Sequence, residues 1–450
     1  MRISPRLISE AVPGRWIGAP RSAAAQLALD TRHFTPGDAF LALVGARFDA
    51  HRFAHEVADE AAWLVGEEAR ARAAGWDALD APQYRVRVDT LEALGEIARA
   101  ARRRINGCVV AITGSVGKTT TKSMLTAMLR AAVGRVHATV GNENNLVGVP
   151  KTVLAAPEDV RVLVLELGTN QPGEIARLSA IAMPDVAVIT AIAPAHLAGL
   201  GSLEGVAREK AALLQACKEG VAVVAPEARP VLARYAPAAL SIREAPVPAV
   251  VPTEEGWALS LHGRVVALPL ALPFAGWAKA AALSVAAARA VLDRLGMSVS
   301  DEKLVAGLAS WRPEAGRMHP YRLRGGLLID DSYNANPASM EAALAFLRTM
   351  PAPRLAVLGE MAELGEEAAR FHEGLSLVGI ERVVLVGELF ASRRDEPGVD
   401  WFAELDEEAL ARIEALAPGF RTILVKGSRA ARMERVVARL REALGAAHAV

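Results

Sequence analysis

Between residues 108 and 193, nearly unbroken apolar runs alternate with segments of helical periodicity. Strands that are buried on both faces read as continuous runs of Val, Ile and Leu, and a strand–helix alternation builds a parallel sheet covered by helices. This stretch is therefore predicted to form an α/β unit. The apolar runs are residues 108–113, 160–168 and 185–193, and the helical segments between them are residues 120–132 and 173–182.

The rest of the chain divides around this unit. Strand-like runs separated by helical sequence return at residues 326–333, 353–361, 382–389 and 421–428 and predict a second α/β domain. Before the central unit lie short strands and helices, in which a Pro-Gly-Asp turn at 36–38 indicates a hairpin or a tight strand connection. Residues 226–275, rich in Pro and Val, predict an extra β element. At roughly 150 residues per domain, the chain is expected to form three domains, 1–88, 89–312 and 313–450.

Composition excludes several classes of partner. The chain carries 51 basic and 51 acidic residues, so no excess positive charge points to nucleic acid or a membrane surface. Cys108 and Cys217 have no CxxC spacing, which fits a reducing cytoplasm. The first residues lack the apolar core of a secretory signal. The apolar stretch 265–292 is interrupted by prolines, Lys279 and Arg289, so no membrane span is expected.

A glycine loop follows the first apolar run, between a predicted strand and a predicted helix. It lacks the first glycine of a Walker A motif, because position 112 is Ile112. Such a junction still presents backbone N–H groups and a helix N-terminus to an anion. Lys118 is placed to reach the β- and γ-phosphates and Thr119 to bind Mg²⁺, whereas the competing interpretation is an ordinary turn. The loop comprises Gly114, Ser115, Val116, Gly117, Lys118, Thr119 and Thr120.

Further polar residues fall where predicted strands end. Ligands of open α/β sheets bind at the carboxyl edge of the strands. Glu166 ends one run and His196 follows another, so the pair is a candidate Mg²⁺ site, against the simpler interpretation of a turn acid and a structural histidine. Asn142 and Asn145 lie in a Gly-bounded polar loop that Asx turns alone would explain.

The motif Gly-x-x-Gly-Lys-Thr-Thr resembles the ATP loop of the Mur ligase family, which also includes folylpolyglutamate synthases. These enzymes join an amino acid or peptide to a carboxylate at the expense of ATP. The segments 166–175 and 141–150 are similar to family motifs as well. The resemblance implies that Asn142 and Asn145 line the active site. It also implies that Lys210 is carbamylated and holds Mg²⁺, so ATP and two Mg²⁺ ions are the expected cofactors.

The C-terminal motifs "DDSYNANP", "GEMAELG" and "VKGSR" resemble those of family members that add D-alanyl-D-alanine to UDP-N-acetylmuramoyl-tripeptide. The implied reaction passes through an acyl phosphate, with Lys118, Lys210, Glu166, His196 and Arg317 as catalytic residues. By the same resemblance, Arg317, Asp331 and Asn334 complete the ATP site when the domains close. The implied substrate-binding residues are Asp30, Thr31, Arg32, Gly45, Asp49, Tyr333, Asn336 and Lys426.

The implied role is peptidoglycan precursor synthesis in the cytoplasm, and with it cell shape and division, by a monomer whose only partners are its substrates. The third residue of the tripeptide is either diaminopimelate or lysine. The chain departs from the family at Ala278, Lys279 and Ala282, where relatives carry His and Asn residues that hold the nucleotide base. The alternatives are another Mur ligase or a folylpolyglutamate synthase, a nucleotide switch, and a pseudo-ligase without turnover. No guanine-binding Asn-Lys-x-Asp motif occurs.

Overall fold

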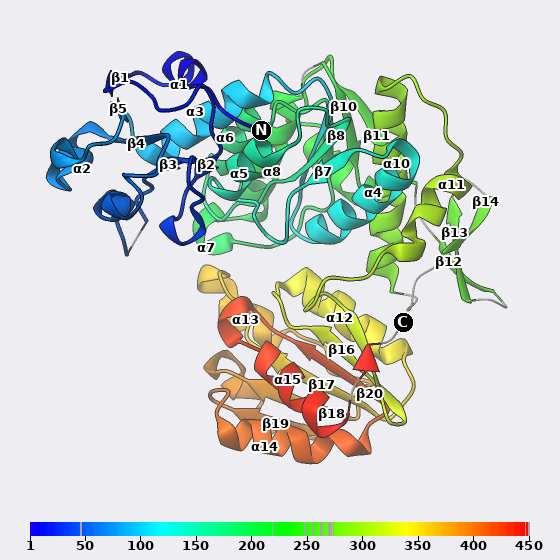
Figure 1. The fold of residues 1–450 in the computed structure, drawn as a ribbon. Coiled ribbons are helices and arrows are strands. Elements are labelled where there is room, and N and C mark those ends of the chain that lie inside the picture. The colour runs from blue at the N-terminus through cyan, green and yellow to red at the C-terminus, as the bar shows by residue number, and fades with distance from the viewer. Residues whose placement is uncertain are drawn as a thin grey trace.

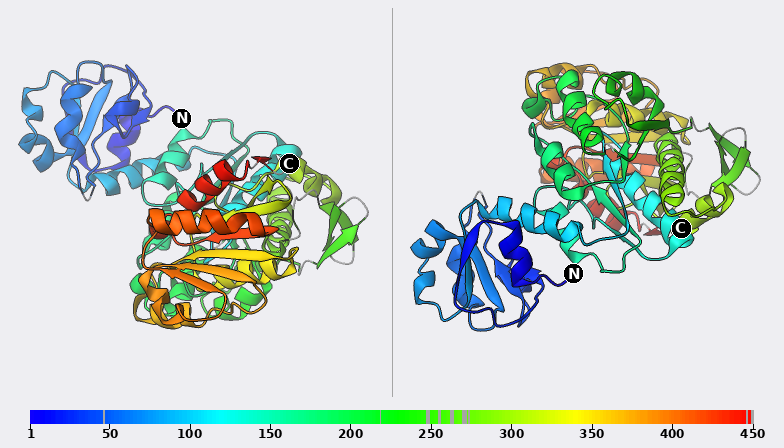
Figure 2. Two further views of the ribbon diagram at one scale, coloured as in Figure 1. Left: turned by 90° about the horizontal axis from the view of Figure 1, so that it is seen from below. Right: turned by 90° about the horizontal axis from the view of Figure 1, so that it is seen from above.

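The computed structural model describes residues 1–450 except 46, 218, 247–248, 254–255, 262–263, 269–271, 273, 446 and 449–450. Successive parts of the chain form separate sheets covered by helices (Figure 1). The predicted three-domain α/β architecture is confirmed. The C-terminal part, yellow to red, lies against the central part, and the N-terminal part, blue, projects to one side of both (Figure 2).

The N-terminal sheet has the strand order β1-β5-β4-β3-β2. The hairpin expected at residues 36–38 is wrong, because β2 and β3 on either side of the turn are parallel. Parallel strands cannot be joined by a tight hairpin, and a short 3-10 helix at Thr31–His33 lies on the connection instead. The elements are α1 Pro5–Ala11, β1 Gly14–Ile17, β2 Leu27–Ala28, β3 Ala39–Leu41, β4 Trp63–Glu67, α2 Glu68–Ala73 and β5 Gln83–Val86, with further 3-10 turns at Ala50–Glu56 and Trp76–Ala78.

The central sheet is parallel throughout, in the order β11-β10-β9-β6-β8-β7. All six residues of β6 are buried, as its unbroken apolar sequence requires. Its neighbours β8 and β9 end at the same edge, so the three loops that follow these strands meet there. The strands are β6 Cys108–Thr113, β7 Val136–Ala138, β8 Val162–Glu166, β9 Val186–Ile189, β10 Val221–Val224 and β11 Ser241–Glu244.

Helices cover the central sheet and join it to its neighbours. Helix α3 packs on α1 of the N-terminal part and on α5 and α6 of the central part, so it bridges the two. The helices are α3 Thr90–Arg102, α4 Lys118–Val133, α5 Gly148–Ala155, α6 Glu174–Ala182, α7 Leu197–Leu200, α8 Leu203–Ala216, α9 Arg229–Leu232, α10 Ala275–Arg294 and α11 Asp301–Ala306. The extra β element is confirmed as an antiparallel sheet of β12 Ala249–Thr253, β13 Gly256–Leu261 and β14 Arg264–Leu268.

Helix α10 is long and apolar enough to cross a membrane by length and composition, but its surroundings explain its sequence. Within its most apolar window 72% of the helix is buried inside the fold, where it packs against α4.

The two cysteines are free and buried, and burial raises the pKa of Cys108 to about 12 and that of Cys217 to about 11. Thiols with such pKa values are poor nucleophiles.

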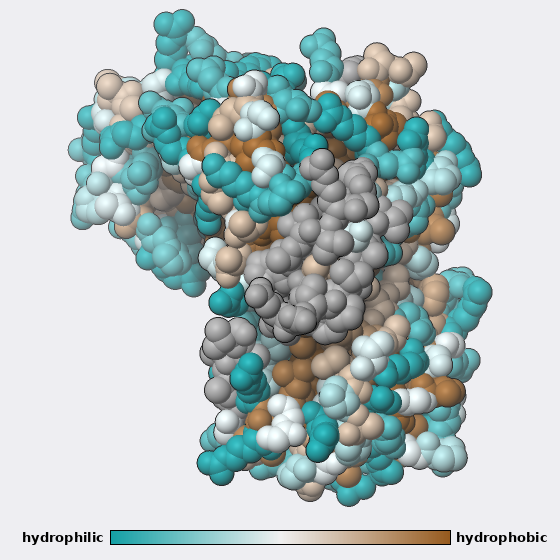
Figure 3. All heavy atoms as spheres, turned by 90° about the vertical axis from the view of Figure 1, so that its right-hand side faces the viewer, coloured by the Kyte–Doolittle hydropathy of each residue, from teal (hydrophilic) through white to brown (hydrophobic). Residues whose placement is uncertain are grey.

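The C-terminal sheet has the order β19-β18-β17-β20-β16-β15-β21. The four predicted strands are β16 Gly326–Asp331, β17 Arg354–Gly359, β18 Arg382–Val386 and β20 Thr422–Lys426, and they form its parallel centre. The sheet also contains β15 His319–Leu323, β19 Val399–Phe402 and β21 Ala447–His448. Its helices are α12 Pro337–Thr349, α13 Ala368–Glu373, α14 Glu407–Leu416 and α15 Glu434–Ala443. On the face shown in Figure 3, hydrophilic residues cover most of the visible surface and hydrophobic ones form patches between them.

Candidate active site

The glycine loop is folded tightly between β6 and α4. Gly114 and Gly117 have φ values of +151° and +85°, which favour glycine. A Cβ on Gly114 would lie 2.0 Å from Oγ1 of Thr190, which itself donates a 2.6 Å hydrogen bond to the Val116 carbonyl. Thr190, in the loop after β9, therefore packs against the glycine loop and bonds to its backbone. The first N–H groups of α4 have no partner within the helix, and this arrangement favours an anion.

We expect Gly114→Ala to weaken ADP binding at least about tenfold and to destabilise the protein by about 1–3 kcal/mol, because the methyl group cannot fit and the backbone would be strained. Calorimetric titration with ADP and urea unfolding measure the two effects. Gly134→Ala is the matched control, since Gly134 has φ +85° but open space around its Cβ position. Equal ADP affinity in Gly114→Ala and the unaltered protein would contradict a phosphate site at this loop.

Lys118 is partly buried beside the loop, and its ammonium donates a 2.8 Å hydrogen bond to the Gly114 carbonyl. Burial lowers the pKa of Lys118, the carboxylate of Glu166 opposes this shift, and the charge of Arg317 adds to it. A partly buried cation held by one carbonyl gains from an incoming anion, because the anion replaces the stabilisation by water that burial removed.

Glu166 ends β8 and is fully buried at the same edge. Its Oε1 accepts hydrogen bonds from Thr119 Oγ1 at 3.1 Å and from Asn144 Nδ2 at 2.8 Å. Its Oε2 lies 3.5 Å from the Lys122 ammonium and has no hydrogen-bond partner. A buried carboxylate oxygen without a hydrogen bond, next to a hydroxyl, fits a hard divalent cation.

The protein alone supplies few ligands for that cation. Among the described residues, no group of three or more His, Cys, Asp and Glu side chains is gathered as a metal site. Mg²⁺ is commonly held by one or two carboxylates together with substrate phosphates. The donor set of Glu166 and Thr119 fits this kind of site.

His196 follows β9 and begins α7. Its Nδ1 contacts Oε2 of Glu363 in the loop after β17, so its partner in the structure comes from the C-terminal part of the chain. The hydrogen bond with His196 lowers the pKa of Glu363. Glu363 was not predicted as a site residue, although it lies within the "GEMAELG" motif.

Lys210 lies inside α8 and is 1% exposed. Among the described residues, the Lys210 ammonium has no hydrogen-bond or ion-pair partner. Burial lowers the pKa of Lys210 far below its ordinary value. The positive charge of Lys118 acts in the same direction. The neighbouring acid, Glu209, instead accepts hydrogen bonds at 2.7 Å from the backbone N–H groups of Gly173 and Ile175 at the start of α6.

The "DDSYNANP" segment reaches the glycine loop. Asn336 caps α12 together with Ser339, and its Nδ2 donates a 3.3 Å hydrogen bond to the Ser115 carbonyl. Arg317 stacks over the ring of Tyr333 at 4.1 Å from the ring centre. The Asn334 side chain accepts a 2.9 Å hydrogen bond from the N–H of Ala335. The structure thus brings Asn336 to the glycine loop, while the side chain of Asn334 bonds within its own turn.

Asp331 and Lys426 form a buried ion pair in the C-terminal sheet. The Lys426 ammonium lies 2.5 Å from Asp331 Oδ2 and donates to the Asn334 carbonyl at 3.0 Å. Asp331 Oδ1 accepts a 3.0 Å hydrogen bond from the N–H of Met318. Burial raises the pKa of Asp331, and the Lys426 ammonium opposes that rise. The partners of both side chains lie within the C-terminal part, as a structural role requires.

We expect Lys426→Met to destabilise the protein by about 3–5 kcal/mol, because it leaves the buried Asp331 carboxylate without its cation. Urea unfolding followed by circular dichroism measures the loss. In the control, Lys279→Met removes an exposed ammonium that lies 2.9 Å from Glu227, and should cost less than about 1 kcal/mol. Equal losses in the two variants would contradict the structural role of the Asp331–Lys426 pair.

The polar loop 141–148 contributes one residue that was not predicted. Asn144 binds Glu166, whereas Asn145 accepts from the N–H groups of Val147 and Gly148 at the start of α5. The backbone carbonyl of Asn142 accepts a 2.7 Å hydrogen bond from the N–H of Asn144.

Lys122, one turn after Lys118 on α4, is a second residue near Glu166 that was not predicted. Its position at i+4 from Lys118 is the signal that could have identified it.

The predicted substrate residues of the N-terminal part hold short local structures. The Asp30 carboxylate caps the turn at Thr31–His33 and binds the Arg32 guanidinium at 2.6 Å, which lowers the pKa of Asp30. Gly45 donates its N–H to the Phe48 carbonyl at 2.9 Å. Asp49 Oδ1 lies 2.6 Å from His51 Nδ1 and Oδ2 lies 3.2 Å from Arg70, and these partners lower the pKa of Asp49 against the effect of burial.

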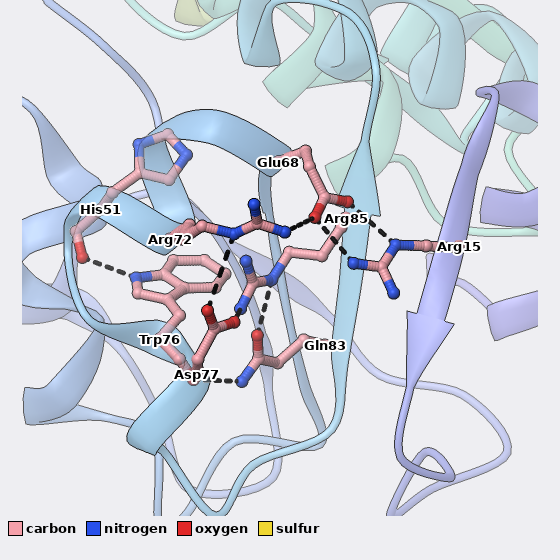
Figure 4. Close-up of polar contacts among 8 residues, drawn as sticks. All are labelled: Arg15, His51, Glu68, Arg72, Trp76, Asp77, Gln83 and Arg85. Atoms are coloured by element: carbon pink, nitrogen blue, oxygen red, sulfur yellow. Dashed lines mark hydrogen bonds and ion pairs between the residues drawn. The ribbon is translucent and has the colours of Figure 1, made fainter.

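A polar network around the buried Arg85 supports this region (Figure 4). Arg85 is fully buried, with its guanidinium 5.5 Å from the centre of the Trp76 ring, 2.7 Å from Gln83 Oε1 and 3.0 Å from Asp77 Oδ1. The indole N–H of Trp76 donates to the His51 carbonyl at 2.8 Å. The network ties β5 to the segment that follows Asp49.

The positions that depart from the family lie on α10. Ala278 and Ala282 are each 1% exposed within the packed helix. Lys279 is exposed and bound to Glu227. The first turns of α10 instead carry an aromatic group, in which Phe274 packs edge-on against Trp277 and Trp277 against Trp311.

Comparisons with known proteins give a consistent family. The Mur ligase middle domain matches residues 112–241, and the Mur ligase glutamate ligase domain matches residues 316–429. The UDP-N-acetylmuramoyl-tripeptide–D-alanyl-D-alanine ligase of Escherichia coli is 37% identical, over 92% of this chain and 93% of its own. The Bacillus subtilis ligase of the same name is 32% identical, over 91% and 92%.

Solved structures agree with these matches. A crystal structure of MurF from Acinetobacter baumannii superposes with a TM-score of 0.85 at 30% identity, over 98% of this chain and 99% of its own. MurF ligase from Thermotoga maritima in complex with ADP gives a TM-score of 0.81 at 28% identity, over 94% and 98%. A folylpolyglutamate synthase from Mycobacterium tuberculosis, 20% identical with a TM-score of 0.60 over 78% and 94%, shares the fold.

Proposed function

This chain belongs to the Mur ligase family of ATP-dependent ligases, and we propose that it joins D-alanyl-D-alanine to the terminal carboxylate of UDP-N-acetylmuramoyl-tripeptide in peptidoglycan synthesis. Relatives of that name match it over more than nine-tenths of both chains. The structural observation that supports the proposal most is the contact between Asn336 of "DDSYNANP" and Ser115 of the glycine loop. It joins the segment that is characteristic of these relatives to the loop that suits ATP.

The chemistry required is activation of a poor acylating agent. A carboxylate oxygen of the tripeptide attacks the γ-phosphorus of ATP, the bond to the β,γ-bridging oxygen breaks, and ADP leaves. The amine of D-alanyl-D-alanine then attacks the acyl carbon, the carbon–oxygen bond to phosphate breaks, and the nitrogen loses a proton. Such phosphoryl transfer depends on positioning and on charge neutralisation.

We assign the following roles to the site residues. The glycine loop and the N-terminus of α4 bind the phosphates, and the Lys118 ammonium neutralises the transferring group. Arg317 adds a second positive charge, and Asp331 and Asn334 form the wall contributed by the third domain. Glu166, Thr119 and His196 would hold Mg²⁺. When bound, Mg²⁺ neutralises charge that develops on the phosphate oxygens.

Lys210 is suited to carbamylation, as in relatives. Only a neutral amine adds to CO₂, forming a nitrogen–carbon bond and releasing one proton. Burial without a partner favours the neutral amine at Lys210. The resulting carbamate would be an anion beside the charge of Lys118 and would supply a further oxygen ligand for Mg²⁺.

We assign a separate role to each of the three domains, residues 1–88, 89–312 and 313–450. The first binds the UDP end of the tripeptide substrate, with Asp30, Thr31, Arg32, Gly45 and Asp49 near the diphosphate. The second binds ATP, with Asn142 and Asn145 in the loop at its edge. The third brings Tyr333, Asn336 and Lys426. We place the monomeric enzyme in the cytoplasm, where ATP and the nucleotide-linked substrate are present.

Release of ADP in the presence of varied amine donors tests the proposal. With UDP-N-acetylmuramoyl-tripeptide and ATP present, ADP release should require D-alanyl-D-alanine, and the product should be the amide. Turnover with glutamate in place of the dipeptide would favour a folylpolyglutamate synthase activity instead. No phosphate release with all three substrates would indicate a pseudo-ligase, an alternative motivated by the altered positions on α10.

A further inference from the structure

One residue of the third domain makes two contacts with the central domain. The carboxylate of Glu363 contacts Nδ1 of His196, and the Glu363 carbonyl accepts a 3.1 Å hydrogen bond from the N–H of Ala198. The two loops concerned follow β17 and β9, and α7 and α13 face each other where these domains meet (Figure 1). Glu363 therefore holds both the side chain of His196 and the backbone beyond it.

The backbone at both residues is in a conformation that side chains rarely adopt. His196 has φ +54° and Glu363 has φ +62°. Non-glycine residues in this region are strained, and they persist only where their surroundings hold them. The loop also lies close to its partner at Gly365, where an added Cβ would be in ordinary van der Waals contact, 3.5 Å from the Cα of Ala198. Two strained residues that meet across a domain boundary indicate that the surrounding structure maintains this contact.

Stability is a poor explanation for this contact. The side chain of Glu363 remains 49% exposed and that of His196 21% exposed. An ion pair this accessible to water stabilises a fold little. Its main consequence is for the orientation of the imidazole. With Nδ1 directed at a carboxylate, Nε2 is left with its lone pair and is the nitrogen available to a ligand.

We infer that Glu363 is a positioning residue, which fixes the ring of His196 so that Nε2 can bind the divalent cation only while the third domain lies against the central domain. This inference rests on the proposed function, which makes His196 a cation ligand. It adds a physical link between domain closure and the metal site: separation of the domains removes the carboxylate and frees the ring to rotate.

Four variants of the full-length protein test the link. Glu363→Ala removes the acceptor, Glu363→Gln keeps an oxygen that can accept from Nδ1, His196→Gln removes the imidazole, and Glu366→Gln is the control. Glu366 lies in the same loop and is exposed. The readouts are the Mg²⁺ concentration that gives half-maximal ADP release at saturating substrates, and Mn²⁺ binding by electron paramagnetic resonance with ADP present.

We expect Glu363→Ala to raise the half-saturating Mg²⁺ concentration and the dissociation constant of Mn²⁺ by about 10-fold or more, as for other residues that orient a metal ligand. The fall in kcat at saturating Mg²⁺ should be smaller than this. Glu363→Gln should recover part of the loss, and Glu366→Gln should match the unaltered protein. Circular dichroism identifies any unfolded variant, and the Gln variant keeps the test decisive if the Ala variant unfolds.

The outcomes separate this inference from the proposed function. If His196→Gln weakens Mn²⁺ binding but neither Glu363 variant does, the positioning role is wrong and the metal assignment stands. If His196→Gln also leaves Mg²⁺ dependence and Mn²⁺ binding unchanged, His196 is not a ligand, and both the assignment and the inference fail. If Glu366→Gln weakens binding as much as Glu363→Ala, the effect belongs to the charge of the loop, and the inference is overturned.

Discussion

Replacing Lys118 with Ala is expected to lower kcat by about 10³-fold or more while the protein remains folded. The ammonium lies against the Gly114 carbonyl, where it can meet the transferring phosphoryl group. A single cation that stabilises the charge of such a transition state is worth roughly 10³–10⁵ in rate. Removing it also removes the cost of burying a charge, so thermal stability should be equal or higher. Steady-state ADP release and thermal unfolding of the same samples measure the two quantities.

The matched control for this prediction is Lys151→Ala. Lys151 lies on α5, its side chain is 56% exposed, and it pairs with Glu143 at the surface. It should leave kcat within about twofold, since an exposed pair contributes little. A Lys118→Ala enzyme that retains a tenth or more of the kcat would show that the phosphoryl group is transferred elsewhere.

Replacing Lys210 with Arg is expected to lower kcat by about 10²-fold or more, because a guanidinium cannot form a carbamate and keeps a positive charge beside Lys118. Burial lowers the pKa of Lys210, which favours the neutral amine that reacts with CO₂. Removal of CO₂ from the buffer should lower the activity of the unaltered enzyme, and bicarbonate should restore it.

A carbon-13 spectrum provides the direct readout of this modification. With labelled bicarbonate, the unaltered protein should show a carbamate signal that Lys210→Arg lacks, and Lys151→Arg should retain the signal. Activity that is independent of CO₂, together with the same spectrum in all three proteins, would contradict carbamylation at Lys210.

The parts of the fold that could be predicted are those that local sequence determines. The run 108–113 is apolar because β6 is buried on both faces, and the predicted helical segment 120–132 lies within α4, which begins two residues earlier at Lys118. The outer strands of the C-terminal sheet gave weaker signals. Strand β19 is half-buried along its length, and β15 is short, contains Pro320 and has only two fully buried positions. The parallel pairing of β2 and β3 was missed because strands of two and three residues carry almost no pattern.

The residues of the candidate site also divide into those that local sequence indicates and those that depend on contacts between distant segments. Glu166 and the glycine loop were identified because strand ends in a parallel sheet share one edge. Asn144 and Glu363 were missed because their roles depend on contacts between distant segments, such as the 167 positions that separate His196 from Glu363. Spacing along the chain does not encode such contacts. The contact of Asn144 with Glu166 becomes visible once the central domain is folded, and that of Glu363 with His196 once the third domain lies against the second.

The origin of the oxygen in the released phosphate tests the central claim most directly. The tripeptide substrate is labelled with oxygen-18 in its terminal carboxylate and converted with ATP and D-alanyl-D-alanine. If the carboxylate is activated as an acyl phosphate, one labelled oxygen passes to each phosphate released, and mass spectrometry will detect it. Unlabelled phosphate, with both labelled oxygens still in recovered tripeptide or with the label lost to water, would contradict activation of the carboxylate by ATP at this site.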